Sequence, residues 1–247
     1  FCTISAHQGK FVQSRSEESI LKEAERVAGM DDFKGYISDL GGPSANMYKM
    51  QGINTDQCVK CKRESCIYPS ICKNLDISHN PLLNLYEKIS AVKGIKKAFV
   101  GSGIRYDLFL DDKGYLNESG KRYLREVIVN HTSGRFKVAP EHTQEHVLKS
   151  MGKPSFALFQ NLKLEFDSII KKEGLKYQIV PYFISSHPGC TMEDMKSLAQ
   201  NPYLKDIRLE QVQDFTPTPL TRSSIIFCTG IDPKTLKTIF VEKSPEM

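Results

Sequence analysis

Four cysteines crowd into one short polar stretch of the chain, and their types and spacing are those of a metal site. Two, four and five residues separate them in the order Cys58, Cys61, Cys66 and Cys72. Four thiolates can close around a tetrahedral metal ion, and thiolates can equally hold an iron–sulfur cluster. Interleaved basic side chains would offset the thiolate charge: Lys60, Lys62 and Arg63. The stretch therefore predicts zinc or an Fe–S cluster; the alternative is a mobile loop of free or oxidised cysteines.

A second set of candidate residues lies where predicted strands end. Gly41-Gly42 would let the backbone approach a ligand closely, although a plain tight turn is the alternative. Glu141 follows a strand and a proline, where its two oxygens could hold vicinal sugar hydroxyls, or where it could simply cap a helix. His187-Pro-Gly189 precedes a helix capped by Thr191, and backbone N–H groups point outward at such a helix start, although a structural turn is the alternative.

Composition places the chain among ordinary globular proteins. It has 247 residues, of which 40% are hydrophobic and 26% charged, enough for one large domain or two small ones. We expect no membrane span, because no apolar run reaches about 18 residues, and we see no secretory leader. The seven cysteines are then expected to be reduced, in a cytoplasmic protein. The net charge of +5 suits a nucleic-acid or anionic partner, or an ordinary basic cytosolic protein.

A strand, a polar turn and a helix repeat about five times along the chain. We expect strands over 35–40, 95–100, 135–139, 177–184 and 207–212. We expect helices over 16–30, 81–92, 119–129, 144–151, 155–172 and 191–199, and a Thr- and Pro-rich loop over 213–223. This alternation predicts an α/β fold with a parallel sheet, whose carboxyl strand ends carry the functional site. A further strand is expected to precede Phe1.

Several motifs in order resemble one enzyme superfamily. Phe1-Cys2 matches the end of the cysteine motif of radical S-adenosylmethionine (SAM) enzymes, in which an aromatic residue precedes the third cysteine. Lys137-Val-Ala-Pro-Glu-His-Thr-Gln-Glu-His-Val-Leu-Lys-Ser-Met-Gly-Lys153 resembles their fourth-strand segment, and His187-Pro-Gly-Cys-Thr-Met-Glu-Asp194 their fifth-strand loop. Asp39-Leu-Gly-Gly42 falls where their Gly-Gly-Glu segment belongs. Taken as a whole, the chain resembles the radical SAM core of the YgiQ-type family, an uncharacterised group of large bacterial Fe–S proteins.

The resemblance implies a fold and a chemistry. The fold would be a partial (β/α)6 TIM-type barrel, with the core spanning 1–247, its first strand missing and a Cys-rich insertion over 52–78. A [4Fe–4S] cluster would bind SAM through its fourth iron, and reduction of SAM would give a 5′-deoxyadenosyl radical that abstracts hydrogen from an unknown substrate. The implied partners are an electron donor such as flavodoxin or ferredoxin, the flanking domains of a parent protein, and the substrate, for which nucleic acid is one candidate.

The same resemblance assigns roles to individual residues. Cys2 would be the third cluster ligand, and Glu141 would hold the ribose of SAM. Arg105, with Asp107, would face the cavity and contact the substrate or the SAM carboxylate. The remaining residues would contact SAM along its length: Gly41 and Gly42 at the methionine end, and Phe1, Ser186, His187 and Pro188 near the adenine.

The chain departs from the family pattern in three ways, and two rival functions remain. The Cys-rich insertion over 52–78 is not part of the common core. The other two cluster cysteines are expected before Phe1, so the fragment alone is expected to be inactive, and Pro43 replaces the acid of the Gly-Gly-Glu segment. One rival is a metal-stabilised nucleic-acid-binding module, which predicts salt-dependent RNA binding without SAM. The other is a lyase or aldolase using Lys137.

The histidines outside the strand ends are expected at the surface or in caps: His79, His131 and His146.

Overall fold

The computed structural model divides the chain into two compact units. It describes residues 1–9, 11–42, 44–111, 113–207 and 209–243. Unit 1 comprises Phe1–Phe11, Ala139–Gln160 and Val180–Met247, and unit 2 comprises Val12–Val138 and Asn161–Ile179. Three elements, introduced below, contain residues of both units.

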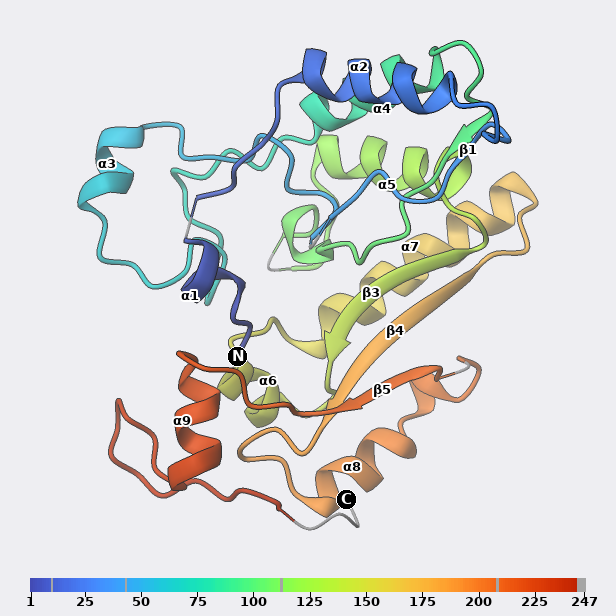
Figure 1. Ribbon diagram of the computed structural model, residues 1–247. Helices are drawn as coiled ribbons and strands as arrows, with labels where there is room; N and C mark the ends of the chain where they lie inside the picture. Colours follow the sequence, from blue (N-terminus) through green and yellow to red (C-terminus); the bar gives the residue numbers. More distant parts are fainter. Residues whose placement is uncertain (10, 43, 112, 208, 244–247) are drawn as a thin grey trace. The chain divides into compact units, whose positions relative to one another are not determined.

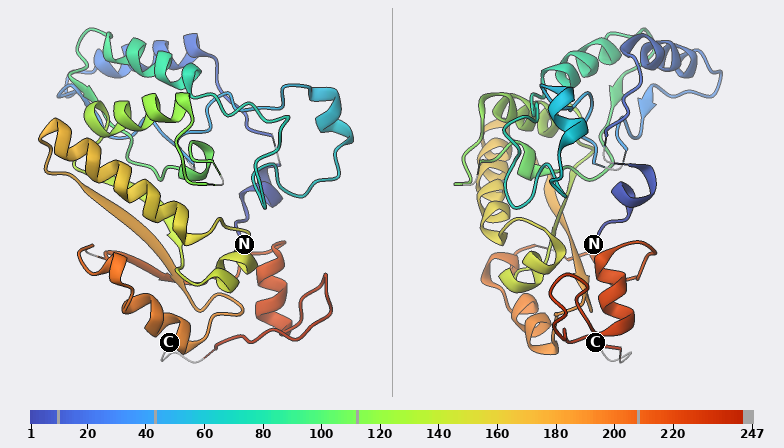
Figure 2. Two further views of the ribbon diagram at one scale, coloured as in Figure 1. Left: turned by 180° about the vertical axis from the view of Figure 1, so that it is seen from behind. Right: turned by 90° about the vertical axis from the view of Figure 1, so that its left-hand side faces the viewer.

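Unit 2 is built on three amphipathic helices and a short parallel sheet. The helices are α2 (Glu17–Ala28), α4 (Asn80–Ser90) and α5 (Glu118–Asn130), and α4 packs against both of the others (Figures 1 and 2). Strands β1 (Tyr36–Ile37) and β2 (Lys97–Ala98) pair in parallel. Apolar and aromatic side chains of α4 and α5 are almost wholly buried and form the core of this unit: Tyr86, Ile89, Tyr123 and Leu124.

The start of α2 shows how the sequence sets a helix boundary. The Ser16 side chain accepts a hydrogen bond from the Ser19 N–H at 3.2 Å, and Glu17 and Glu18 follow in the first turn. The cap satisfies an N–H group that the helix leaves unpaired, and the acidic residues face the positive end of the helix dipole. The predicted start at Ser16 is therefore confirmed to within one residue.

Unit 2 also holds the segment predicted to be an insertion. It contains α3 (Thr55–Lys60), which begins at the N-cap Asn54 and which the sequence did not predict. In Figure 1 this helix lies on a long excursion between β1 and α4. Farther along the chain, a 3-10 turn, η1 (Tyr106–Leu108), leads to α5.

A second sheet carries three longer strands. Strands β3 (Arg135–Glu141), β4 (Gln178–Ser185) and β5 (Gln211–Asp214) lie in that order, and β5 pairs in parallel with β4. Helix α7 (Phe156–Glu173) connects β3 to β4 along the chain, after α6, and Phe166 of α7 packs on Phe136 of β3 with ring centroids 5.6 Å apart. Strands β3 and β4 and helix α7 are the elements that both units share.

The rest of unit 1 consists of short helices. These are α1 (Ile4–Gln8), α6 (Glu145–Met151), α8 (Met192–Ala199), the 3-10 turn η2 (Pro202–Leu204) and α9 (Arg222–Thr229). Thr191 caps α8 as predicted: its hydroxyl accepts from the Asp194 N–H while the Asp194 carboxylate accepts from the Thr191 N–H, a complete capping box.

The α/β class with parallel strands is confirmed, within the described part of the chain, as two open sheets and not as a closed barrel. The fifth predicted strand, 207–212, is wrong in its bounds, because the strand occupies Gln211–Asp214. Helices α1 and α9 were not predicted. Among the described residues, no helix combines the length and the apolar character that crossing a membrane would require.

Candidate functional site

A buried ion pair marks the carboxyl end of β3 in unit 1. The Lys153 Nζ lies 3.0 Å from Oε1 of Glu141 and donates to the Ala139 carbonyl at 3.3 Å. The Glu141 and Lys153 side chains are only 10% and 18% exposed. The same ammonium lies 5.8 Å from the centre of the Phe1 ring, within cation–π range. Lys153 thus joins two residues that are far apart in the sequence, Phe1 and Glu141.

Glu141 also has an unusual backbone. Its φ is 69°, in the left-handed region that non-glycine residues rarely occupy. Ser186, at the end of β4, is the second strand-end residue with this geometry, at a φ of 57°. Such residues cost of order 1 kcal/mol or more and cluster at binding sites. Both strand ends therefore turn sharply at residues that the sequence singled out.

His187 is the aromatic centre of unit 1. It is fully buried, with Phe1 and Phe215 packed edge-on against it at centroid distances of 6.0 and 5.0 Å. Its Nδ1 donates to the Pro188 carbonyl at 3.0 Å, so its Nε2 accepts from the Ser223 hydroxyl at 2.9 Å. Burial lowers the pKa of His187 to about 4. The ring is therefore neutral at pH 7, with both nitrogens engaged.

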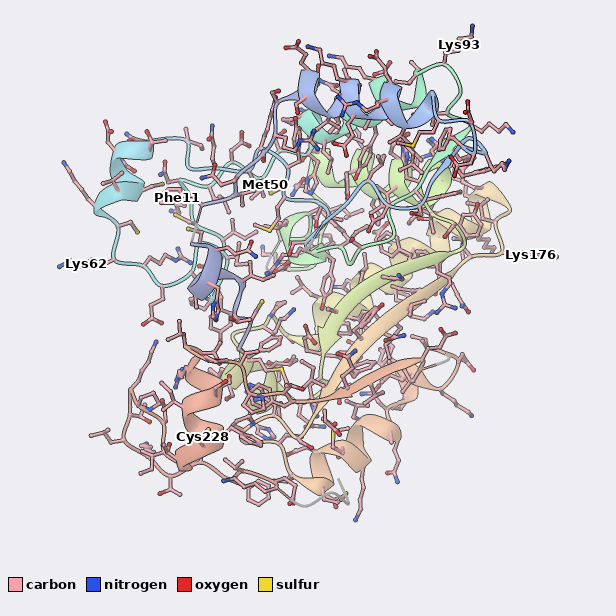
Figure 3. The ribbon with its side chains drawn as sticks, in the orientation of Figure 1. Phe11, Met50, Lys62, Lys93, Lys176 and Cys228 are labelled. Atoms are coloured by element: carbon pink, nitrogen blue, oxygen red, sulfur yellow. The ribbon has the colours of Figure 1, made fainter. Side chains whose placement is uncertain are left out.

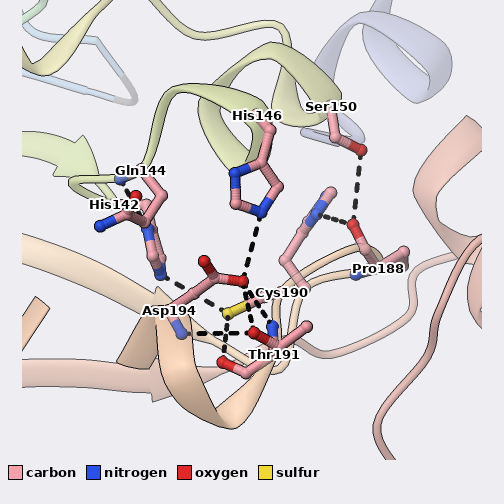
Figure 4. Close-up of polar contacts among 9 residues, drawn as sticks. His142, Gln144, His146, Ser150, Pro188, Cys190, Thr191 and Asp194 are labelled. Atoms are coloured by element: carbon pink, nitrogen blue, oxygen red, sulfur yellow. Dashed lines mark hydrogen bonds and ion pairs between the residues drawn. The ribbon is translucent and has the colours of Figure 1, made fainter. Parts of the chain in front are cut away.

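His142 and Cys190 form a second buried polar contact (Figure 4). The Gln144 N–H donates to His142 Nδ1 at 3.0 Å, which leaves the ring proton on Nε2, 3.5 Å from the Cys190 sulfur. Burial lowers the pKa of His142 to about 4 and raises the pKa of the Cys190 thiol to about 11. Cys190 is therefore a protonated thiol in the core.

A third polar group, the Asp194 carboxylate, belongs to the N-terminal cap of α8. Asp194 accepts from both the N–H and the hydroxyl of Thr191, at 2.8 and 2.7 Å, and lies 3.2 Å from Nε2 of the exposed His146 (Figure 4). Burial alone would raise the pKa of Asp194, but these hydrogen bonds and His146 hold that pKa below its usual value. The carboxylate is thus committed to the helix start.

In unit 2, Asp39 braces the turn that contains the two glycines. Its Oδ1 accepts from the N–H groups of Gly41 and Gly101 at 2.8 and 2.9 Å, and its Oδ2 accepts from the Ser102 hydroxyl. Burial would raise the pKa of Asp39, but these donors outweigh it and keep that pKa low. A Cβ on Gly41 would lie 2.9 Å from that of Ala45, whereas a Cβ on Gly42 would meet nothing within 4 Å. Gly41 serves packing, and Gly42 presents open backbone.

Arg105 is held by its neighbour. Its Nε and a terminal nitrogen donate to Asp107 at 3.1 and 2.6 Å, a two-pronged ion pair. Its backbone is fixed by Asn46, which accepts from the Arg105 N–H at 2.8 Å and donates to its carbonyl at 2.9 Å. Asn46 donates in turn to Nε2 of His79 at 3.1 Å. The charge of Arg105 is thus balanced within its own segment.

Two of the histidines follow the capping alternative of the prediction and not the surface alternative. His79 is the N-cap residue of α4 and His131 is the C-cap residue of α5, and their exposed fractions are only 1% and 2%. Each packs against Tyr86 or Tyr123 in the unit 2 core, and each has a polar partner there that offsets the cost of burial. For His131 that partner is the Ala98 carbonyl, which accepts from Nδ1 at 2.7 Å. His146 is exposed, as predicted.

All the predicted metal-binding cysteines are free thiols. Cys2, Cys61 and Cys66 are exposed, and Cys58 and Cys72 are half-buried. Within the described ranges, no three His, Cys, Asp or Glu side chains form a group ready to share a metal ion. The assignment of these five cysteines as metal ligands stays a prediction. Pro43, at which the acid of the family segment is replaced, lies outside the described residues.

The predicted site residues therefore fall into two groups. Phe1, Glu141 and Ser186-His-Pro188 come together in unit 1, whereas Gly41, Gly42 and Arg105 belong to unit 2. Sequence reasoning missed Lys153. Its partner Glu141 lies twelve positions earlier in the sequence, on the other side of α6. A lysine directly after the Met-Gly that ends α6 was the available signal. It also missed Ser223 and Phe215, which no local pattern connects to His187.

Comparison with known proteins points to one group of relatives. No family model matches the chain. A protein of Bacteroides thetaiotaomicron is 55% identical over 246 residues, which cover 99% of this chain and 40% of that protein. A protein of Porphyromonas gingivalis is 51% identical over 252 residues, covering 100% of this chain and 40% of the relative. Both are named UPF0313 proteins.

The chain is similar to the UPF0313 proteins. The similarity extends to archaea, where a UPF0313 protein of Methanosarcina acetivorans is 42% identical over 245 residues, or 98% of this chain and 32% of its own length. The chain spans about two fifths of the length of the first UPF0313 relatives, and their name states no activity.

Proposed function

We propose that this chain is the core of a radical SAM enzyme, which binds a [4Fe–4S] cluster and SAM and abstracts hydrogen from a substrate. The observation that carries the proposal is the grouping in unit 1. Phe1, next to the cysteine, lies against His187 and beneath Lys153, which pairs with Glu141. Phe1, Glu141 and His187 are residues that the family resemblance assigns to SAM, and they come from three separate parts of the sequence.

The side chains of unit 1 suit the adenosine part of SAM. The Glu141 carboxylate is an acceptor for ribose hydroxyls, and Lys153 and the φ of 69° fix its position. His187 has both ring nitrogens occupied, so it would flank the adenine by packing and not by hydrogen bonding. Phe1 adds a second aromatic surface beside it.

The residues fit a cluster only in part. Cys2 is an exposed free thiol and supplies one ligand. The other two cysteines of unit 1 add no cluster ligand in the proposal. The buried Cys190 thiol is in hydrogen-bond contact with His142, and Cys228 is an exposed residue of α9. In the proposal, the two remaining thiolates come from sequence outside this chain. When bound and reduced, the cluster supplies the electron that cleaves SAM and so starts the radical chemistry.

In unit 2, Gly42 keeps its proposed role toward the methionine part of SAM, because nothing lies within 4 Å of the point where its Cβ would stand. Arg105 enters the proposal only as a pair with Asp107, since a ligand carboxylate would have to compete with that ion pair. The electron donor would be a flavodoxin or ferredoxin, and the setting would be the reducing cytoplasm, where exposed thiols and such donors persist.

The test uses a full-length protein that contains this chain, reconstituted anaerobically with iron and sulfide. We expect a reduced [4Fe–4S] signal in electron paramagnetic resonance that changes on adding SAM, and formation of 5′-deoxyadenosine. Cys2→Ser should abolish the SAM-sensitive signal, and Cys228→Ser, at an exposed cysteine of the same unit, should keep it. A SAM-sensitive cluster that survives Cys2→Ser would refute the proposal.

Glu141→Gln separates SAM binding from cluster binding. The loss of a charged acceptor should weaken SAM binding by roughly tenfold or more while the cluster signal persists. The matched control is Glu193→Gln, at an exposed acid of α8 whose side chain is 79% exposed. Equal SAM affinity in the Glu141 and Glu193 variants would remove Glu141 from the site.

A further inference from the structure

The insertion over residues 52–78 has no core of its own. Every residue in this range is described, and none is buried. Its aliphatic side chains Ile53 and Val59 are 72% and 78% exposed. A segment of this size that buries no side chain gains little from the hydrophobic effect, and such segments usually depend on a disulfide or a metal. All four of its cysteines are free thiols.

The two ends of the insertion are closed upon one another. Gly52 and Leu75 form an antiparallel bridge, and the Ile53 N–H donates to the Asn74 carbonyl at 2.7 Å. The Asn74 side chain donates to the Asn54 carbonyl at 2.9 Å. These contacts close one loop, which carries Cys58, Cys61, Cys66 and Cys72. Closure of the loop limits how far any of the four can move from the others.

Backbone and side-chain N–H groups already point at the sulfurs. The Asn74 amide donates to the Cys58 sulfur at 3.2 Å, and the Arg63 N–H donates to the Cys61 sulfur at 3.4 Å. The Cys72 N–H donates to the Cys66 carbonyl at 2.7 Å, which ties the third cysteine to the fourth. N–H donors to sulfur stabilise thiolates and orient metal ligands.

Positive charge accompanies the four cysteines. The basic residues of the same loop would offset the charge of four thiolates bound to a metal ion: Lys60, Lys62, Arg63 and Lys73. Lys62 extends outward from the loop (Figure 3).

We propose that Cys58, Cys61, Cys66 and Cys72 bind one metal centre through four thiolates, as a zinc ion or an Fe–S cluster. Each coordinating thiol releases its proton to solvent, and no electron is transferred. Among the described residues the thiols do not form a metal-ready group of three, so the proposal requires the loop to close when the metal binds, which would supply the core that the loop lacks. This site uses no residue of the proposed SAM site and stands or falls independently of it.

The first experiment titrates the reduced, metal-free chain with Co2+, whose tetrahedral tetrathiolate complex has a strong thiolate-to-cobalt absorption band. We expect one equivalent to bind in the unchanged chain and in Cys228→Ser. In Cys66→Ser the affinity should fall by roughly a hundredfold or more. Displacement of Co2+ by one equivalent of Zn2+ would assign zinc. Retention of iron and sulfide at cluster stoichiometry after reconstitution would assign an Fe–S cluster.

A second measurement protects the test against variants that misfold. The tryptic sites Lys60, Lys62 and Lys73 lie in the exposed parts of the loop. Metal should slow cleavage there in the unchanged chain and not in Cys66→Ser, while cleavage elsewhere stays equal in both. The proposal is overturned if neither metal binds stoichiometrically, or if a variant with all four cysteines changed to serine binds as the unchanged chain does.

Discussion

His142 and His187 are each held in a single neutral form by their hydrogen bonds. His142 carries its proton on Nε2 because Nδ1 accepts from the Gln144 N–H, and His187 carries it on Nδ1 because the Pro188 carbonyl can only accept. Protonating either ring would place a charge in the buried interior of unit 1 and break an accepting hydrogen bond. At the scale of single residues, these rings are structural supports for the proposed site and not acids or bases.

Stability should therefore fall as the pH is lowered from 6.5 to about 4. Burial lowers the pKa of each ring from 6.5 to about 4, so in this window the unfolded chain binds protons that the folded chain does not. Above pH 6.5 both rings are neutral in the folded and the unfolded chain, and below about pH 4 both are charged in each state, so their contribution to the slope vanishes outside this window. Each histidine contributes roughly 3 kcal/mol at most. Urea unfolding at pH 7, 6 and 5 measures the slope.

The matched variants for this slope are His142→Gln and His146→Gln. Glutamine can still accept from the Gln144 N–H and donate to Cys190, so His142→Gln should flatten the dependence on pH. His146 is exposed, and its replacement should leave the dependence as it is. An unchanged slope in His142→Gln would show that this ring is not buried in its neutral form.

At the scale of elements, the turn after β1 shows two glycines with different duties. Asp39 draws together the N–H groups of Gly41 and Gly101, which packs the Gly41 Cα against Ala45 and Ser102. Gly42 follows directly and has open space where a side chain would begin. The two positions therefore separate folding from ligand approach.

Gly41→Ala should destabilise the chain, and Gly42→Ala should not. The new methyl group at position 41 would lie 2.9 Å from the Ala45 Cβ and 3.0 Å from the Ser102 Cβ, which is overpacking that costs about 1–3 kcal/mol. At position 42 the change should stay within about 0.5 kcal/mol. Urea unfolding compares the two. If Gly41→Ala proves as stable as the unchanged chain, the tight packing of this turn is wrong.

The positions of most elements followed from the sequence, whereas their lengths and partners did not. Ser16 and Thr191 predicted two helix starts because capping is local chemistry. Strands β1 and β2 were placed correctly but shrink to two residues each, because sheet pairing depends on a partner that one segment does not specify. Helix α9 was missed within a Thr- and Pro-rich stretch, although Thr221 caps it.

The candidate site was predictable in its members but not in its contacts. Glu141 and His187 were found from their places at strand ends, while Lys153 and Ser223 were not, since only the fold brings them to these partners. The burial of His79 likewise depends on Asn46, thirty-three positions away in the chain. Periodicity shows which face of an element is apolar, but it does not show which polar side chain that face meets.

At the scale of the whole molecule, neither unit is a continuous stretch of sequence. Strand β3 passes from unit 2 to unit 1 between Val138 and Ala139, α7 passes back between Gln160 and Asn161, and β4 crosses between Ile179 and Val180. Each of these three elements belongs partly to both units. If one unit unfolds, its part of the shared strand or helix unfolds as well, and the part in the other unit loses hydrogen bonds.

We therefore expect the chain to unfold in one cooperative transition. Hydrogen exchange under mild urea should give the same opening free energy for the core amides of α5, in unit 2, and for those of β4 from Val180 to Ser185, in unit 1. The amides of α3, in the coreless insertion, should exchange through a separate opening of lower energy. Distinct free energies for α5 and β4 would instead indicate two independent folding units.

The left-handed backbone of Glu141 has a consequence for recognition. The backbone sets the direction of the Cα–Cβ bond and the ion pair with Lys153 holds the carboxylate, so this largely buried side chain keeps less rotational freedom before any ligand arrives. A flexible glutamate gives up of order 1–2 kcal/mol of conformational entropy when it is ordered. Here that loss and the strain of a positive φ are both incurred during folding. A hydroxyl-bearing ligand would meet an acceptor already in position, and its binding free energy would not be reduced by the cost of ordering that acceptor.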